Sequence, residues 1–311
     1  MKGNIKEKEV HDLFEYKSKQ QTINIGGVKV GGIPGQNPTV LVGTIFYHGH
    51  KIFRDEKTGD FDRKQAEEVI NGQEEISDKT GNPCMLDVVG ATPDTMKKFV
   101  EFTASVTDAP ILMDGPTPDA KIAGLEYASE VGLIDRVVYN SLILEYKQEE
   151  IEKIKETGLR NALLLAYNPK EFTTTGRIKA IKKLLEVTRE VGIDRPLLDT
   201  CVLDIPGLGM ACRASFELKN EFGLPVGCGA HNAVSLWKGL KTKFGKQAVK
   251  PAVASACVIA AAVGADFVLY GPAEDAGYVF PVIAMTDAAY GYLLFEKKVA
   301  LDRKHPLYRI A

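Results

Sequence analysis

The chain has 311 residues, of which 45% are hydrophobic and 26% charged, and its 39 Lys and Arg nearly balance its 41 Asp and Glu. This near-neutral balance gives no support for a nucleic-acid-binding protein, which normally shows a basic stripe. A chain of this length can bury a sizeable core without metals or disulfides, as one large α/β domain or two ordinary ones.

The cysteines and the distribution of apolar residues give a first idea of the compartment. The five cysteines are irregularly spaced, which predicts reduced thiols in a cytoplasmic protein. Residues 1–20 are polar and charged, so we expect an N-terminal arm rather than a secretory signal, followed by one domain over 21–311. Residues 251–273 come closest to transmembrane length, but Gly264 and Asp266 interrupt them. We therefore expect a buried helix that runs into a buried strand, and no membrane insertion.

Short apolar runs alternate with amphipathic stretches along most of the chain. Residues 21–32 alternate polar and apolar residues around Gly26 and Gly27, which predicts a β-hairpin. Strands are expected at residues 38–47, 84–90, 109–114, 136–140, 161–167, 195–200, 224–230 and 266–272. Helices are expected at residues 63–81, 93–106, 118–132, 147–158, 175–192 and 207–223, in an Ala-rich segment from residue 251, and at 280–296. Glycines that follow several of these helices suit the left-handed C-cap position.

Eight strand–helix pairs in about 270 residues predict a (β/α)8 TIM barrel with the hairpin covering its bottom. The alternative is a doubly wound open sheet. A nucleotide-binding sheet of that kind normally has a G-x-G-x-x-G turn after its first strand, and the sequence has none there. Residues 48–64 form a long polar insertion after the first strand, which places it at the mouth of the barrel as a lid or a partner-docking surface.

Polar residues stand at the ends of four predicted strands: Asp114, Asn140, Asp199 and Asn232. The ends of parallel barrel strands meet at one mouth, so these side chains can surround one small ligand. A carboxylate can accept both the 2-amino group and the N3–H of a pterin-like heterocycle, and an amide can donate and accept at other edges. Asp87 has a similar position in the second strand. The alternative for each residue alone is an N-cap or a turn.

The segment Gly227 to Asn232 adds two further features. Gly227 and Gly229 lack side chains, so a flat ligand could lie close to the backbone. Cys228 and His231 form a Cys-x-x-His pair, but a zinc site needs more ligands than the neighbouring sequence offers, so we expect no bound metal. The other pair, His48 and His50, is an equally weak metal signal.

Several stretches resemble the H subunit of tetrahydromethanopterin S-methyltransferase and its bacterial relatives, the methylcorrinoid:tetrahydrofolate methyltransferases of glycine betaine demethylation. The resemblance extends from about residue 22 to the C-terminus, and its matching stretches are GGVKVGG, NPTVLVGTIFYHGHKI, QEEISDKTGNP, MLDVVG, PDAKIAGLEYA and YNSL. Asp114, Asn140, Asp199 and Asn232 occupy places that correspond to the pterin-contacting residues of methyltetrahydrofolate-dependent barrels. Two departures are the Asp-Gly-Pro-Thr order at Asp114 and His231 before Asn232.

The resemblance implies an enzyme that moves a methyl group from a methylated corrinoid, carried as methylcobalamin on a separate protein, to N5 of tetrahydrofolate. Asn232 is expected to hydrogen-bond N5 and act as the catalytic residue, while Asp114, Asn140 and Asp199 bind the pterin edges, with Asp87, Gly227 and Gly229 in the same pocket. The resemblance also suggests a homodimer. One alternative is a subunit that transfers the methyl group from methyl-tetrahydromethanopterin to a corrinoid. Others are a dihydropteroate-synthase-like barrel, for which we find no convincing anion site, and a non-catalytic pterin-binding or scaffold barrel.

Overall fold

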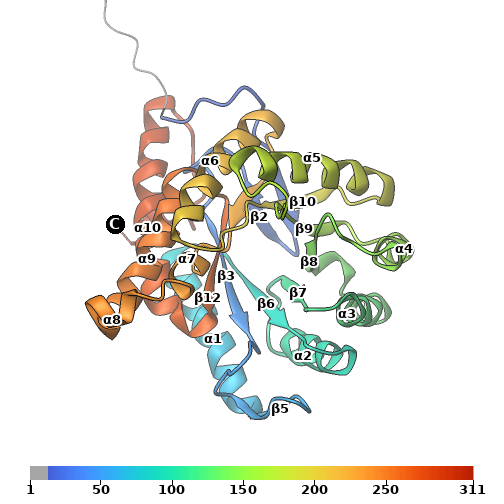
Figure 1. Ribbon diagram of the computed structural model, residues 1–311. Coiled ribbons are helices and arrows are strands. Elements are labelled where there is room, and N and C mark those ends of the chain that lie inside the picture. Colours follow the sequence, from blue (N-terminus) through green and yellow to red (C-terminus); the bar gives the residue numbers. More distant parts are fainter. Residues whose placement is uncertain (1–12, 311) are drawn as a thin grey trace, which may run out of the picture.

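The structure, a computed structural model, describes residues 13–310 and is built around a closed barrel of eight parallel strands (Figure 1). The strands follow one another around the barrel in chain order, and the last pairs with the first, with Phe267 opposite Val40. They are β3 (Val40–Ile45), β6 (Cys84–Val89), β7 (Ile111–Asp114), β8 (Val137–Leu142), β9 (Asn161–Leu165), β10 (Arg195–Asp199), β11 (Val226–Cys228) and β12 (Phe267–Pro272). The predicted (β/α)8 barrel is confirmed.

The helices surround the strands in chain order, from cyan α1 through green α3 and α4 to red α10 (Figure 1). The long helices are α1 (Arg63–Thr80), α2 (Pro93–Val106), α3 (Pro118–Glu130), α4 (Gln148–Thr157), α5 (Thr174–Val191), α6 (Ile205–Phe222), α9 (Val249–Ala262) and α10 (Ala276–Leu293). Two short helices, α7 (Asn232–Ser235) and α8 (Leu240–Phe244), lie between β11 and α9. Gly81, Gly158, Gly192 and Gly223 end their helices in the left-handed conformation, as the sequence predicted.

A β-hairpin closes the bottom of the barrel, where the strands begin. It consists of β1 (Thr22–Ile25) and β2 (Val28–Gly31), which pair antiparallel. Ile25 and Val30 are fully buried and pack in one cluster with strand residues that include Met85 and Leu112. The hairpin therefore seals the lower end of the core, as expected, and leaves the opposite end for function.

Residues 1–12 of the predicted N-terminal arm lie outside the described residues. The rest of the arm contacts the end of α6: the Lys17 N–H donates to Asn220 Oδ1 at 2.9 Å, and Ser18 Oγ donates to the Glu221 carbonyl at 2.7 Å. The boundary between arm and domain stays a prediction.

The insertion after β3 forms a small antiparallel hairpin of β4 (Phe53–Asp55) and β5 (Asp60–Phe61). It covers a group of aromatic side chains, in which Phe46 stacks on Phe99 with ring centroids 4.2 Å apart. Because it lies between the carboxyl end of β3 and the start of α1, the predicted location at the mouth is confirmed. Its role as a lid or docking surface stays a prediction.

The eighth barrel helix lies within the apolar helical stretch Ala273–Lys297, which by length and composition alone could cross a membrane. Half of its most apolar window is buried inside the protein. Val279, Phe280 and Ile283 pack there with Val268 and Tyr270 of β12, so we interpret the stretch as a core helix.

Residues 251–273, the apolar run that comes closest to membrane length in the sequence, do not form one continuous helix. Residues 251–273 instead form most of α9 and β12, which agrees with the expected buried helix that runs into a buried strand.

Candidate functional site at the mouth of the barrel

The polar residues predicted at the strand ends all lie at the carboxyl end of the barrel. Asp87 is within the second half of β6, and Asp114 and Asp199 are the last residues of β7 and β10. Asn140 lies on β8 directly opposite Asp114 in the strand register. Asn232 begins α7, four residues after β11 ends. The barrel thus brings residues from positions 87 to 232 to one mouth, as the parallel arrangement predicts.

Hydrogen bonds connect three of the strands at this mouth. Asp87 is buried and receives a hydrogen bond on each carboxylate oxygen: Asn140 Nδ2 donates to Oδ1 at 2.8 Å, and Thr44 Oγ1 donates to Oδ2 at 3.0 Å. The strand register shifts between Asn140 and Leu142, an irregularity of the kind often found beside functional sites. Thr44 was not predicted from the sequence, because a threonine inside an apolar strand carries no signal of its own.

Burial disfavours the charged form of all three aspartates at the mouth. Burial and the neighbouring Asp114 raise the pKa of Asp87, although the hydrogen bonds from Asn140 and Thr44 oppose the shift. Burial also raises the pKa of Asp114, while Lys121 lowers it. Burial raises the pKa of Asp199 to about 7, against the hydrogen bonds that its carboxylate accepts from two backbone N–H groups. Raised carboxyl pKa values of this kind, gathered in one mouth, are typical of functional sites.

Lys121 supports the end of β8 from α3. Its Nζ donates to the Ser141 carbonyl at 2.9 Å, lies 3.3 Å from Glu150 Oε1, and sits 4.5 Å from the centre of the Tyr139 ring. The Tyr139 hydroxyl donates to the same Glu150 carboxylate. This buried cation therefore lies directly behind Asn140 and provides the positive charge that lowers the pKa of Asp114.

The backbone around Asp199 and the following strand orients its carboxylate. The Cys201 N–H donates to Asp199 Oδ1 at 2.7 Å, and the Gly229 N–H is a second donor. A Cβ atom at Gly229 would meet Asn232 Nδ2 at 3.0 Å, so Asn232 lies over this backbone. At Gly227, by contrast, a Cβ atom would lie 2.1 Å from the Phe267 carbonyl oxygen. Contact with β12 therefore explains Gly227, and the expected approach of a ligand is not needed there.

The histidines and Cys228 that gave weak metal signals have protein partners or are buried. Cys228 is buried in a cluster with residues of α6 and α9. His231 Nδ1 lies 3.0 Å from the Leu269 carbonyl, which requires the proton on Nδ1, and burial lowers the pKa of His231. His48 pairs with Glu56 at 2.7 Å. Among residues 13–310 there is no group of three or more His, Cys, Asp or Glu side chains arranged to hold a metal ion.

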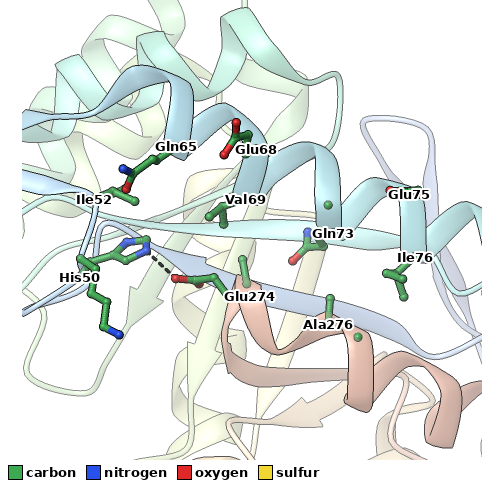
Figure 2. A pocket seen from close by; sticks show the side chains of 14 residues that line it. His50, Ile52, Gln65, Glu68, Val69, Gln73, Glu75, Ile76, Glu274 and Ala276 are labelled. Carbon is green, nitrogen blue, oxygen red and sulfur yellow. Dashed lines mark hydrogen bonds and ion pairs between the residues drawn. The ribbon is translucent and has the colours of Figure 1, made fainter.

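A groove of about 690 Å³ runs beside the mouth between α1 and α10 (Figure 2). At one end of it His50 Nε2 lies 2.7 Å from Glu274 Oε1. His50 Nδ1 accepts the Phe46 N–H at 3.2 Å, so the proton of a neutral His50 is on Nε2 and points at Glu274. Glu68 and Glu75 also line the groove, which makes it predominantly acidic.

Comparisons with known proteins identify the relatives of this chain. Residues 18–302 match the sequence model of the tetrahydromethanopterin S-methyltransferase MtrH subunit. The H subunit of tetrahydromethanopterin S-methyltransferase from Methanothermobacter thermautotrophicus is 42% identical over 96% of this chain and 100% of its own length. The H subunit of the putative methyltransferase mtx from Methanosarcina barkeri is 36% identical over 95% of this chain and 99% of its own length.

Solved structures of low sequence identity share the fold. The dihydropteroate synthase of Yersinia pestis, in complex with a pterine-sulfa conjugate, has a TM-score of 0.60 at 15% identity, covering 87% of this chain and 100% of its own. The enzyme from Xanthomonas albilineans has a TM-score of 0.55 at 15% identity, covering 87% of this chain and 98% of its own. At this identity the similarity establishes the TIM barrel alone.

Proposed function

The chain belongs to the MtrH family, the H subunits of tetrahydromethanopterin S-methyltransferase, and we propose that it transfers a methyl group between N5 of a reduced pterin and the cobalt of a corrinoid on a separate protein. The observation that carries the proposal is the mouth of the barrel. There Asp87, Asp114, Asn140 and Asp199 converge from four strands at the carboxyl end of the barrel, where Asn232 follows β11.

The hydrogen-bonding groups of the mouth match the edges of a pterin ring. An ionised Asp199 is an acceptor for the adjacent 2-amino group and N3–H, which a carboxylate binds as a pair. The amide nitrogen of Asn140 donates a hydrogen bond to Asp87, which leaves the side-chain carbonyl oxygen of Asn140 as a further acceptor for the ring. Asp114 is half-buried at the next strand end, where it can meet another ring N–H. These assignments agree with those made from the sequence and remain proposals.

The proposed chemistry is a nucleophilic displacement at the methyl carbon. When Co(I) attacks the methyl group of the N5-methyl pterin, a Co–C bond forms, the N5–C bond breaks, and its electron pair stays on N5. N5 must therefore be protonated or strongly hydrogen-bonded in the transition state, and Asn232 is our candidate for that hydrogen bond. In the reverse direction N5 attacks methyl-Co(III), and Co(I) leaves. The protein mainly contributes orientation and this hydrogen bond.

The identity of the pterin separates two forms of the proposal. Several relatives at 35–42% identity are H subunits of tetrahydromethanopterin S-methyltransferase, so we place transfer from methyl-tetrahydromethanopterin to a corrinoid first. Transfer from a methylated corrinoid to tetrahydrofolate, the leading expectation from the sequence, becomes the second candidate.

We further propose, as expected from the sequence, that the protein is a homodimer in the cytoplasm. Light scattering of the purified protein would test the oligomeric state.

Titration calorimetry with each tetrahydropterin, followed by incubation with methylcobalamin, tests the proposal. We expect one pterin to bind and to produce cob(I)alamin, detected by its absorbance under anaerobic conditions. The variant Asp199→Asn is the control, because it should weaken both signals while the protein remains folded. Binding without any transfer to or from a corrinoid would favour the scaffold alternative. Failure of both pterins to bind would overturn the proposal.

A further inference from the structure

The turn that follows Asp199 contains a residue in an unusual backbone conformation. Cys201 has φ of 57°, in the left-handed region that side chains other than glycine rarely adopt. Such residues persist where the surrounding structure determines them, and they concentrate at functional sites. Here the conformation directs the Cys201 N–H at Asp199 Oδ1, 2.7 Å away. The orientation of the Asp199 carboxylate therefore depends on what holds this turn.

A buried arginine from the neighbouring helix holds the turn. Arg177, in the first turns of α5, is 0% exposed. Its Nε donates to the Thr200 carbonyl at 2.8 Å and its Nη2 to the Cys201 carbonyl at 3.1 Å. The guanidinium lies 4.2 Å from the centre of the Phe172 ring. In the part of the chain that the structure describes, Arg177 forms no ion pair, so these two carbonyls are its main polar partners.

We propose that Arg177 is a positioning residue, which clamps the Thr200 and Cys201 carbonyls and thereby fixes the Asp199 carboxylate at the barrel mouth. A planar guanidinium can donate to two adjacent carbonyls at fixed spacing, which an ammonium group cannot reproduce. A purely packing role would be served by any large side chain on α5. The role of Asp199 as a pterin ligand rests on the proposed function, but the geometry of the turn does not.

Glycine at position 201 separates positioning from packing. Glycine adopts positive φ without steric cost, so Cys201→Gly should make the turn less dependent on Arg177. We expect Arg177→Lys to weaken pterin binding about fivefold or more, which corresponds to the loss of one hydrogen bond. The double variant Arg177→Lys/Cys201→Gly should recover to within about twofold of Cys201→Gly alone, since the two residues act through one turn. Cys201→Ala keeps the Cβ atom and removes the thiol, so it should give no such rescue.

A readout without ligand keeps this proposal separate from the proposed function. The NMR signal of the Cys201 amide should titrate with Asp199, whose pKa this hydrogen bond lowers. Arg177→Lys should therefore move the titration to higher pH, and the double variant should move it back. Other titratable groups near Asp199 are Asp87 and the thiols of Cys201 and Cys228. Cys201→Ala accounts for the thiol of Cys201.

Arg195→Lys, at the opposite end of β10, is the matched control and should change neither readout. Wild-type affinity and an unchanged titration in Arg177→Lys would overturn the proposal. If Arg177→Lys fails to fold, the double variant tests the proposal in its place. The double variant must then fold and bind the pterin like Cys201→Gly. Its failure to do so would equally overturn the proposal. Absence of pterin binding in the wild type, with the amide titration behaving as expected, would refute the proposed function and leave Arg177 as the clamp.

Discussion

The amide nitrogen of Asn140 donates to Oδ1 of Asp87 at 2.8 Å, so one strand end fixes the side-chain orientation of another. Because the amide nitrogen of Asn140 faces Asp87 as the donor, this bond determines which end of the amide faces the mouth. Asn140 then presents its carbonyl oxygen to a ligand. Thr44 orients Asp87 in turn, through its hydroxyl group on Oδ2.

The first prediction concerns this pair. Replacing Asp87 by Ala should leave the Asn140 amide free to rotate and weaken tetrahydropterin binding by about fivefold or more. Thr44→Val removes one donor to Asp87 and leaves Asn140 bonded, so its loss of affinity should be smaller. Calorimetric titration of both variants and the wild type with the tetrahydropterin measures the order of their affinities. Equal affinity of Asp87→Ala and wild type would show that the orientation of Asn140 does not matter for binding.

A second prediction follows from the pKa of Asp199. Burial raises it to about 7, and only the ionised carboxylate accepts both ring donors. The affinity for a neutral tetrahydropterin should therefore rise with pH, by about tenfold between pH 6 and pH 8. Binding measured across this range should be flat for Asp199→Asn and weaker than wild type throughout. A wild-type affinity that does not change with pH would remove Asp199 from the set of ring-binding residues.

Stability should show the opposite pH dependence, which gives a third prediction. Asp87 and Asp114 have raised pKa values in the folded state, so the folded protein binds protons that the unfolded chain has already released. Their contribution to stability is therefore greatest at low pH and is lost as the pH rises above the ordinary range of a carboxyl group. Asp114→Asn removes one of the two charges and also lowers the pKa of Asp87, because Asp114 helps to raise it.

Urea denaturation at several pH values measures this effect. The free energy of unfolding of Asp114→Asn should fall less between acid and mildly alkaline pH than that of the wild type. Asp119→Asn, exposed in the first turn of α3, is the matched control and should follow the wild-type curve. Parallel curves for Asp114→Asn and wild type would mean that Asp114 has an ordinary pKa.

The pattern of strands in the sequence predicted where the site residues lie, but it did not predict the hydrogen bonds that those residues form. Asp114, Asn140 and Asp199 could be found because the carboxyl ends of parallel strands must meet, whatever their side chains do. The bond from Thr44 to Asp87 depends on the register between β3 and β6, which the apolar pattern alone does not determine. The close approach of the Phe267 carbonyl on the next strand, which requires a glycine at position 227, could not be predicted for the same reason.

The bottom of the barrel offers a fourth prediction, on stability alone. Lys219 Nζ lies 2.6 Å from both carboxylate oxygens of Asp266 and 3.3 Å from the Gly32 carbonyl. Lys219→Met would leave Asp266 buried without its counter-charge, which should destabilise the protein by about 3–5 kcal/mol. Adding Asp266→Asn should recover part of this loss. Urea denaturation measures both variants. Pterin affinity should stay at the wild-type value, since the pair is at the opposite end of the barrel from the mouth.

The last prediction separates catalysis from binding at Asn232. Its amide lies over the Gly229 backbone at the mouth, where it can contact N5 as the N5–methyl bond breaks or forms. A hydrogen bond that strengthens in the transition state contributes to rate far more than to ground-state affinity, and loss of one such donor typically slows a reaction by about 100- to 1,000-fold.

Asn232→Ala should therefore slow single-turnover methyl transfer, followed by stopped-flow absorbance of the corrinoid, by about this factor. The dissociation constant of the pterin should change by less than about fivefold. Ser235→Ala, on the same short helix, is the control, since its hydroxyl donates to the His231 carbonyl at 3.2 Å. A wild-type transfer rate combined with weakened binding would assign Asn232 to recognition of the ring instead of the reaction at N5.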